Sequence, residues 1–266
     1  MPLTEQELQR YGRQLVMPEI GEEGQEKLKS SRVLVVGTGG LGSPAAFYLA
    51  AAGIGTLGLL DSDRVELSNL QRQILHGEPT LGKNKVDSAQ HTLENLNPYI
   101  KVETHHLRID VDNVEDIISR YQVIVDGCDN FRTRYLINDA CVIHRRPFVY
   151  GSVMRFEGQA SVFFPPASGC YRCLFKEPPP PGAVPSCQET GVVGIAPGLI
   201  GIVEATETIK LLLETGSSLL NRLLIFDGLE MSFMDVNYNQ DPLCPVCGKE
   251  PSITSIEDEN YPPNSI

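Results

Sequence analysis

A short apolar run at residues 33–36 is followed at once by Gly37, Gly39 and Gly42 in the pattern G-x-G-x-x-G. An Ala-rich stretch of helical character comes next and ends at Gly53. Glycines suit such a turn because the backbone must approach phosphates closely and the helix must pack against the strand. The pattern therefore predicts a strand, a phosphate-binding turn and a helix whose free N–H groups face an anion.

A second strand is expected at residues 56–60, and Asp61 ends it. An acidic residue at this spacing accepts hydrogen bonds from ribose hydroxyls in nucleotide-binding folds. The glycine pattern alone does not separate NAD, FAD and ATP as ligands. A glycine-rich turn without any ligand is the structural alternative.

The alternation of strands and helices continues to about residue 150. We expect strands at 101–105, 123–126 and 148–150, and helices at 83–97, 114–119 and 131–143. Such alternation predicts an α/β fold, a Rossmann-like, mostly parallel sheet wrapped by helices on both faces.

After residue 150 the pattern changes to that of antiparallel strands. Strands are expected at 160–164 and 223–226, and 231–236 alternates like a half-exposed strand. A long apolar helix is expected from about 198 to 213. The Pro-rich segment 177–185 forms neither helix nor central strand and is expected to be a surface loop. The sequence thus predicts a C-terminal antiparallel extension of the sheet.

Bulk composition narrows the function classes. The net charge of −12 and the absence of a basic run argue against nucleic-acid binding. The longest apolar region, 192–213, is interrupted by charged residues, so no membrane span is expected. The acidic N-terminal segment does not resemble a signal peptide. We therefore expect a cytoplasmic protein whose seven cysteines are reduced, metal-bound or catalytic.

Cations cluster in the segment after Asp61, which includes Arg64, Arg72, Lys83 and Lys85. A hydride-transfer enzyme has no need of them at this place. An enzyme that attacks the α-phosphate of ATP does, because negative charge spreads over phosphoryl oxygens in the transition state. Each cation taken alone could equally be a solvated surface charge.

Asp129 follows the expected strand 123–126, at the sheet edge where open α/β folds bind ligands. A carboxylate facing a triphosphate is suited to hold Mg²⁺. The alternative is that Asp129 or Asn130 caps the helix that begins near residue 131.

Two C-x-x-C pairs stand far apart in the chain. Cys170 with Cys173 and Cys244 with Cys247 could supply four thiolates to a structural Zn²⁺ that joins two loops. A redox pair or unrelated buried thiols are the alternatives. Cys187, just after the Pro-rich segment, is a candidate nucleophile or an ordinary loop cysteine. Cys128 and Cys141 are expected to be small core residues.

Together these motifs resemble those of the MoeB/ThiF/HesA family, which is related to the adenylation domains of ubiquitin-activating enzymes. The resemblance runs from residues 10–14 to Cys247. It rests on the sequences GTGGLGS at 37–43, DSD at 61–63, SNLQRQ at 68–73, GKNK at 82–85 and DGCDN at 126–130, together with both cysteine pairs.

The resemblance implies roles for individual residues. Asp61 would hold the ribose, with Asp63 and the glycine loop, including Gly40, forming the rest of the nucleotide site. The triphosphate would contact Asn69, Arg72 and Lys85, with Gln73 helping to position it. Asp129 would bind Mg²⁺. Arg13 would reach into the site of a partner subunit, which implies a homodimer, and the helix at 198–213 would suit a subunit interface or a core position equally.

The resemblance also implies a reaction: ATP-dependent adenylation of the C-terminal Gly carboxylate of a small ubiquitin-like sulfur-carrier protein. A MoaD-like carrier ending in Gly-Gly would pass its tail under the Pro-rich loop, yielding an acyl-adenylate and pyrophosphate. A separate sulfur donor, a cysteine desulfurase or rhodanese, would then act. A MoeB-like role in molybdenum-cofactor synthesis is favoured. The alternative is ThiF-like activation of a ThiS-type carrier in thiamine synthesis, in which Cys187 matches the position of a covalent link.

On this interpretation the chain divides into four regions: an N-terminal helical arm at 1–30, a Rossmann-like ATP-binding region at 31–150, a carrier-binding and zinc region at 151–250, and a loosely packed tail at 251–266. Two other functions compete. An NAD-dependent oxidoreductase would share the glycine pattern, but the five histidines form no acid–base pattern. A non-catalytic scaffold would have no use for Arg13, Arg72, Lys85 and Asp129 together.

Overall fold

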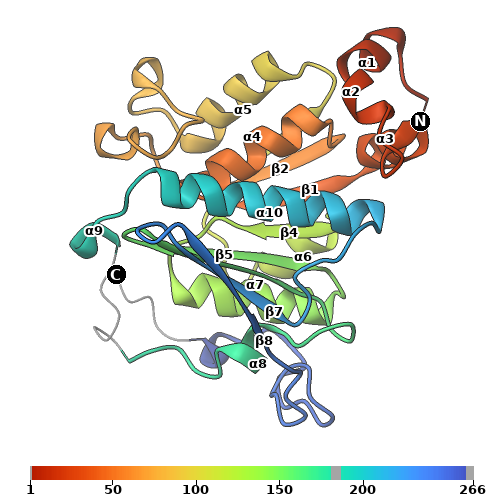
Figure 1. The fold of residues 1–266 in the computed structure, drawn as a ribbon. Coiled ribbons are helices and arrows are strands. Elements are labelled where there is room, and N and C mark those ends of the chain that lie inside the picture. The colour runs from red at the N-terminus through yellow and green to blue at the C-terminus, as the bar shows by residue number, and fades with distance from the viewer. Residues whose placement is uncertain (1, 181–186, 262–266) are drawn as a thin grey trace.

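A computed structural model describes residues 2–180 and 187–261. Within these residues the chain forms one eight-stranded sheet in the order β3-β2-β1-β4-β5-β6-β7-β8 (Figure 1). The expected α/β architecture, mostly parallel with an antiparallel extension, is confirmed.

The parallel half of the sheet contains β1 Arg32–Val36, β2 Thr56–Leu60, β3 Lys101–His105, β4 Val123–Asp126 and the first part of β5 Phe148–Met154. The four apolar residues of β1 at 33–36 are all buried, as a parallel strand covered on both faces requires. Helices cover the two faces: α4 Gly42–Ala52, α5 Lys85–Leu96, α6 Val114–Ser119 and α7 Phe131–Ile143.

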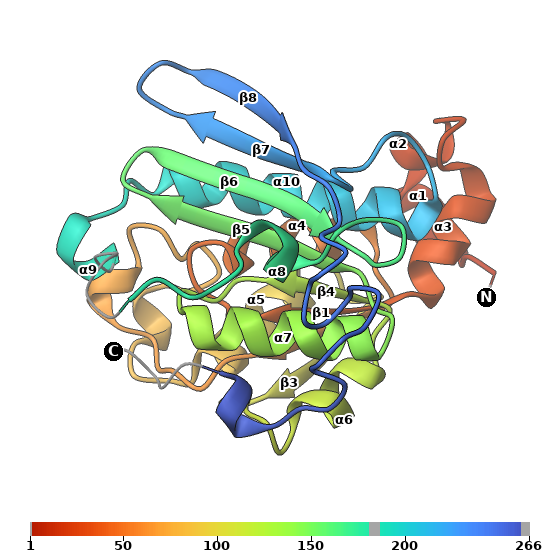
Figure 2. The same cartoon turned by 90° about the horizontal axis from the view of Figure 1, so that it is seen from below.

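The antiparallel half adds β6 Glu157–Phe163, β7 Arg222–Asp227 and β8 Ser232–Asn237. The long helix α10 Ile195–Leu213 packs against α4 and across β5 and β6. Figure 2 shows the hairpin of β7 and β8 extending away from the layers of helices. The parallel and antiparallel parts therefore meet at β5, above which α10 lies.

Two expectations about strands need correction. β5 does not end at residue 150 but runs to Met154, where Arg155 with φ 54° turns the chain into β6. The extension was missed because residues 151–154 lack an apolar run. β8 is not half-exposed: all six of its residues are exposed, because it is the edge strand of the sheet and extends past α10.

The N-terminal segment forms α1 Glu5–Arg10, α2 Gly12–Leu15 and α3 Gly21–Ser30. The predicted capping box is present: the Thr4 hydroxyl accepts from the backbone N–H of Glu7, and the Glu7 carboxylate accepts from that of Thr4. Figure 1 shows these helices at one end of the molecule, with α9 Cys187–Thr190 at the other. The arm therefore lies far from the carboxyl ends of the parallel strands.

The tail is better ordered than expected. Tyr261 is buried and packs beside the guanidinium of Arg172, and Arg132 pairs with Asp258 in the short helix η3 Asp258–Asn260. The tail is therefore anchored at these two points, although residues 251–260 are mostly exposed, and residues 262–266 lie outside the described part. No helix in residues 2–180 and 187–261 is long and apolar enough to span a bilayer.

Candidate active site

A cavity of about 350 Å³ opens at the carboxyl ends of β1, β2 and β4. Its wall contains most of the residues expected to form the nucleotide site: Gly37, Gly39, Gly40, Asp61, Asp63, Arg72, Gln73, Lys85 and Asp129. Parallel strands bring these residues together because their carboxyl ends share one edge of the sheet.

The glycine loop is shaped by close backbone contacts. Gly37 has φ +89°, a conformation that other residues rarely adopt, and a Cβ there would lie 2.6 Å from the carbonyl oxygen of Gly127. A Cβ on Gly42 would lie 1.8 Å from the carbonyl oxygen of Gly37. Gly42 is not part of the cavity wall, so its role is to let α4 begin directly beneath the loop.

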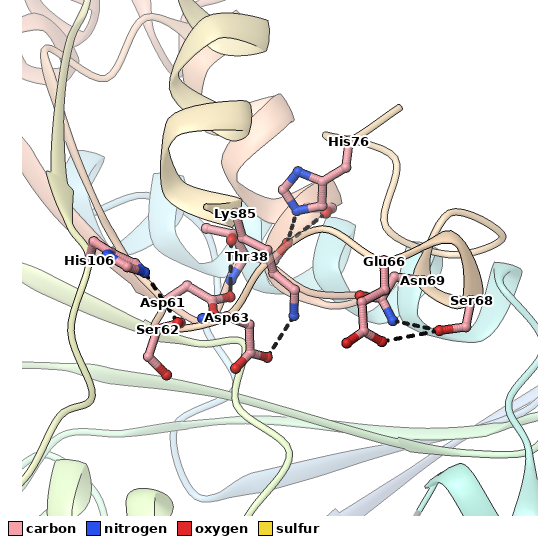
Figure 3. Close-up of polar contacts among 11 residues, drawn as sticks. Thr38, Asp61, Ser62, Asp63, Glu66, Ser68, Asn69, His76, Lys85 and His106 are labelled. Carbon is pink, nitrogen blue, oxygen red and sulfur yellow. Dashed lines mark hydrogen bonds and ion pairs between the residues drawn. The ribbon is translucent and has the colours of Figure 1, made fainter. Parts of the chain in front are cut away.

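Asp61 ends β2 with its carboxylate fixed from within the protein (Figure 3). Its Oδ2 accepts hydrogen bonds from the backbone N–H and the hydroxyl of Thr38, at 2.8 and 3.0 Å. Its Oδ1 accepts from the backbone N–H of Asp63 at 2.9 Å. The orientation expected of a ribose-binding acid is thus set by the glycine loop.

Three cations face the cavity. Lys85, at the start of α5, is buried, and its Nζ lies 2.8 Å from Oδ2 of Asp63. Arg72 is half-buried and donates to the carbonyl oxygen of Ser68 at 3.2 Å. Arg108, in the loop after β3, is the third. The wall also contains the carboxylates of Asp61, Asp63 and Asp129, so it presents charges of both signs to a ligand.

The alternatives for Asp129 and Asn130 are now distinguished. The Asn130 side chain caps α7 by accepting from the backbone N–H of Thr133 at 2.9 Å. Asp129 is exposed in the cavity wall and does not serve as the cap. Its carboxylate is therefore placed where a metal on a triphosphate could be held.

Several predicted site residues lie outside the cavity wall. Asn69 is in the short helix η1 Leu67–Asn69, where its amide donates to the hydroxyl of Ser68. Arg13 is exposed on α2, at the opposite end of the molecule (Figure 1). Cys187 begins α9, but its side chain lies outside the described residues, as does most of the Pro-rich segment. Among the described residues of one chain, Asn69 and Arg13 therefore do not line the cavity.

Two parts of the wall were not predicted from the sequence. One is the loop Leu107, Arg108 and Ile109, whose position could have been inferred from its place after β3 at the same sheet edge. The other is the start of α10, where Pro197 contacts the glycine loop, and a Cβ on Gly194 would lie 2.4 Å from the carbonyl oxygen of Gln71. No local signal links residues so far apart in sequence.

A buried ion pair supports the loop after β4. The Arg134 Nε donates to Asp126 Oδ2 at 3.0 Å, and its Nη2 donates to the carbonyl oxygens of Cys128 and Gly151. Burial raises the pKa of the Cys128 thiol well above its usual value. Cys128, like the buried Cys141, is thus a core residue, as expected.

The two cysteine pairs come together where the segment after β6 meets the segment after β8. Their four Sγ atoms lie within 4.8 Å of one another, with distances of 4.0 Å from Cys170 to Cys173, 3.5 Å from Cys170 to Cys244 and 3.4 Å from Cys173 to Cys247. Four ligands at a Zn–S distance of about 2.3 Å stand about 3.8 Å apart in a tetrahedron. The cluster has the donor set and the size of a zinc site.

Comparison with known protein families now adds to this geometry. Residues 11–246 match the ThiF family. The chain belongs to this family. The matched range includes the glycine loop, the cations, Asp129 and three of the four paired cysteines, with Cys247 one residue beyond it, so the resemblance inferred from the motifs is confirmed.

Individual relatives of this ThiF-family chain are similar over nearly its whole length. It is 47% identical to the sulfur carrier protein adenylyltransferase of Thermus thermophilus, over 97% of both chains. It is 49% identical to the SAMP-activating enzyme E1 of Haloferax volcanii, over 98% of this chain and 96% of that one. The structure of E. coli MccB with ATP superposes with a TM-score of 0.78 at 25% identity, over 90% of this chain and 74% of MccB.

Proposed function

We propose that this protein uses ATP to adenylate the C-terminal glycine carboxylate of a small ubiquitin-like sulfur-carrier protein. The observation that carries the proposal is the cavity wall, where Asp61, Arg72, Lys85 and Asp129 converge beside the glycine loop. The Thermus thermophilus relative, named a sulfur carrier protein adenylyltransferase, supports the choice of substrate.

In this proposal the nucleotide lies along the cavity. Asp61 holds the ribose hydroxyls, and the triphosphate extends over the glycine loop toward Arg72 and Lys85. A carboxylate oxygen of the carrier attacks the α-phosphorus, the bond from that phosphorus to the bridging oxygen breaks, and pyrophosphate leaves. Arg72 and Lys85 stabilise the negative charge that develops on the phosphoryl oxygens and on the leaving group.

Asp129 would hold Mg²⁺ in this site. The carboxylate fits because it is exposed to the cavity while Asn130 fills the capping position. Magnesium, when bound, neutralises charge on the departing pyrophosphate. The nucleotide itself would be positioned by Asp61, Arg72 and Lys85.

Zn²⁺ would be held by Cys170, Cys173, Cys244 and Cys247, with a structural role. The four thiols present a closed donor set, without an open position for substrate. Zinc would tie the loop after β6 to the loop after β8, and thiolates of this kind suit the reducing cytoplasm. Metal analysis of the native protein should find one zinc per chain, and a metal-free native protein would contradict the assignment.

The carrier would dock on the antiparallel half of the sheet, within the region 151–250. Large apolar side chains are exposed there on one face of the strands: Met154 at 38%, Met234 at 62% and Val236 at 38%. Such a patch is typical of a protein-binding surface. From this patch the Gly-Gly tail would reach the cavity beside β5. The Pro-rich segment and Cys187 belong to the same region of the sequence, 151–250.

The enzyme would act as a homodimer. Gln14, Tyr48, Ile202 and Ile209 line a shallow groove between α2, α4 and α10, and Ile202 and Tyr48 are 41% and 49% exposed. Because Arg13 stands next to this groove and far from its own cavity, a partner packed here could receive it. The α10 helix thus offers both a core face and a face for association.

A separate donor, a cysteine desulfurase or rhodanese, would carry a persulfide whose terminal sulfur attacks the acyl carbon and displaces AMP. A thiol reductant would then cleave the acyl disulfide, which leaves a thiocarboxylate on the carrier and a disulfide between the donor cysteine and the reductant. We favour a MoaD-like carrier and molybdenum-cofactor synthesis, on the strength of the whole motif set.

Intact-mass analysis tests the proposal directly. Small ubiquitin-like proteins ending in Gly-Gly are incubated with the enzyme, Mg²⁺ and ATP, beside matched versions lacking the last glycine. The proposal predicts the added mass of one adenylyl group on an intact carrier and none on its truncated form. Adenylyl transfer to neither form of any carrier, from an enzyme that binds ATP, would contradict it.

A further inference from the structure

His76 lies buried between the glycine loop and α5, behind the wall of the cavity. Its Nε2 is 2.9 Å from the carbonyl oxygen of Thr38, and its Nδ1 is 3.0 Å from the hydroxyl of Ser88 (Figure 3). Neither His76 nor Thr38 is part of the cavity wall. The ring therefore connects two elements of the site without touching the cavity.

The partners of the ring define its protonation. A carbonyl oxygen can only accept, so Nε2 carries the proton and donates it to Thr38. In the neutral ring Nδ1 is unprotonated and lies 3.0 Å from the Ser88 hydroxyl, which also donates to the Thr80 hydroxyl at 2.9 Å. Burial lowers the pKa of His76, with the positive charge of Lys85 acting in the same direction, which favours this neutral form.

Thr38 transmits this contact to Asp61. The same residue that accepts from His76 donates its backbone N–H and its hydroxyl to Oδ2 of Asp61. With Asp63 donating to Oδ1, three of about four acceptor positions on the carboxylate are filled. The remaining acceptor position belongs to Oδ1. Because Thr38 fixes the other oxygen of the same carboxylate, the direction in which this free position points depends on how rigidly Thr38 is held.

We propose that His76 is a positioning residue that gives the nucleotide site its selectivity for the ribose hydroxyls, acting through Thr38 on Asp61. This proposal rests on the placement of the ribose at Asp61. Ser88 stands one helical turn after Lys85 on α5, so the ring also joins the ribose side of the site to the element that carries the phosphate lysine. Loss of the ring would loosen the carboxylate while leaving the cavity wall chemically unchanged.

Binding of two nucleotides separates this role from simple packing. The affinities of ATP and of 2′,3′-dideoxy-ATP, each with Mg²⁺, are measured by titration calorimetry on the full chain. Wild type should prefer ATP about tenfold, the scale of one hydrogen bond to a fixed acceptor. In His76→Phe the preference should fall close to one, with the affinity for the dideoxy nucleotide little changed. His76→Gln, whose amide can still donate to Thr38, should keep most of the preference.

The matched control is His105→Phe. His105 is a partly buried histidine whose ring contacts Tyr121 at 2.8 Å rather than the glycine loop, and its loss should leave the preference intact. Thermal melts establish that each variant is folded. If His76→Phe does not fold, Ser88→Ala removes the Nδ1 partner, together with the hydrogen bond from Ser88 to Thr80, and should lower the preference about threefold.

The possible outcomes are distinct. A wild-type preference that survives in His76→Phe, or equal weakening of both nucleotides, would overturn the proposal while leaving the ribose at Asp61. Equal binding of the two nucleotides by wild type would overturn the ribose placement and this proposal together.

Discussion

Lys85 and Asp63 form an ion pair at the cavity wall that an incoming triphosphate must join or replace. The Lys85 side chain is buried, whereas the carboxylate of Asp63, its partner in the ion pair, is exposed to solvent. Asp61 and Asp129 could be named from the sequence because each follows a strand that ends at one sheet edge, and Lys85 because it belongs to the cluster of cations after Asp61. His76 could not, since its role depends on buried contacts that no local pattern marks.

Replacement of Lys85 by Ala should lower carrier-dependent ATP–pyrophosphate exchange by about 100- to 1,000-fold, because one donor to the transition-state charge is removed. Lys83→Ala is the matched control: this lysine is two residues away and exposed. Its loss should change the exchange rate little. Equal losses in both variants would show that the exchange rate depends on the net positive charge of this segment and not on the position of the Lys85 ammonium group.

Glu204 on α10 should make stability depend on pH. Its side chain is fully buried against Gly151, and neither carboxyl oxygen has a hydrogen-bond partner among the described residues. Burial raises its pKa well above the usual value. The folded protein thus keeps a proton that the unfolded chain releases above about pH 4.3, so this contribution to stability declines as pH rises, by about 1.4 kcal/mol per unit up to the folded pKa.

Glu204→Gln has no proton to exchange. Its melting temperature relative to wild type should therefore rise steadily from pH 4.5 to pH 8. A difference that stays constant across this range would show that Glu204 is not held protonated.

At the scale of elements, the parallel half of the sheet was predicted almost to the residue: β2, β3, β4, α6 and α7 begin and end where the sequence indicates. β2, β4, α6 and α7 each have a buried apolar run or stripe bounded by polar residues or glycine, whereas in β3 only Val102 is buried. The antiparallel half was predicted less well. β5 continues through half-exposed residues, and the exposure of β8 depends on what covers it, which is decided by tertiary packing rather than by local pattern.

The exposed face of β8 should bind the carrier. Met234→Glu places a charge within the patch of Met154, Met234 and Val236, and should weaken carrier binding at least about tenfold because a buried contact becomes a desolvated charge. Tyr99→Glu is the control, since Tyr99 is 39% exposed beside β3 at the opposite edge of the sheet. Carrier affinity that is unchanged in Met234→Glu would remove this face from the interface.

At the scale of the whole molecule, the N-terminal arm lies at the end opposite α9 (Figure 1), away from the carboxyl ends of β1, β2 and β4 that line the cavity. An arginine on that arm can serve catalysis only across a subunit interface. The groove beside α10 would give such an interface a location, and zinc at the four-cysteine cluster would join two loops in the half of the sheet proposed to receive the carrier.

Mixing two inactive variants tests this arrangement. Arg13→Ala and Lys85→Ala should each be nearly inactive alone. After subunits exchange, half of the dimers would hold one site with its own Lys85 and the partner's arginine, restoring about a quarter of wild-type activity. No recovery, with exchange verified by native mass spectrometry, would show that Arg13 does not act in the partner's site.

The most direct test of the central claim is ATP–pyrophosphate exchange by the purified enzyme, with and without a panel of small carrier proteins ending in Gly-Gly. Adenylation of a carrier carboxylate predicts exchange that appears with a matching carrier and disappears when its last glycine is removed. An enzyme that binds ATP yet shows no exchange with any carrier, or exchanges equally without one, would contradict the account.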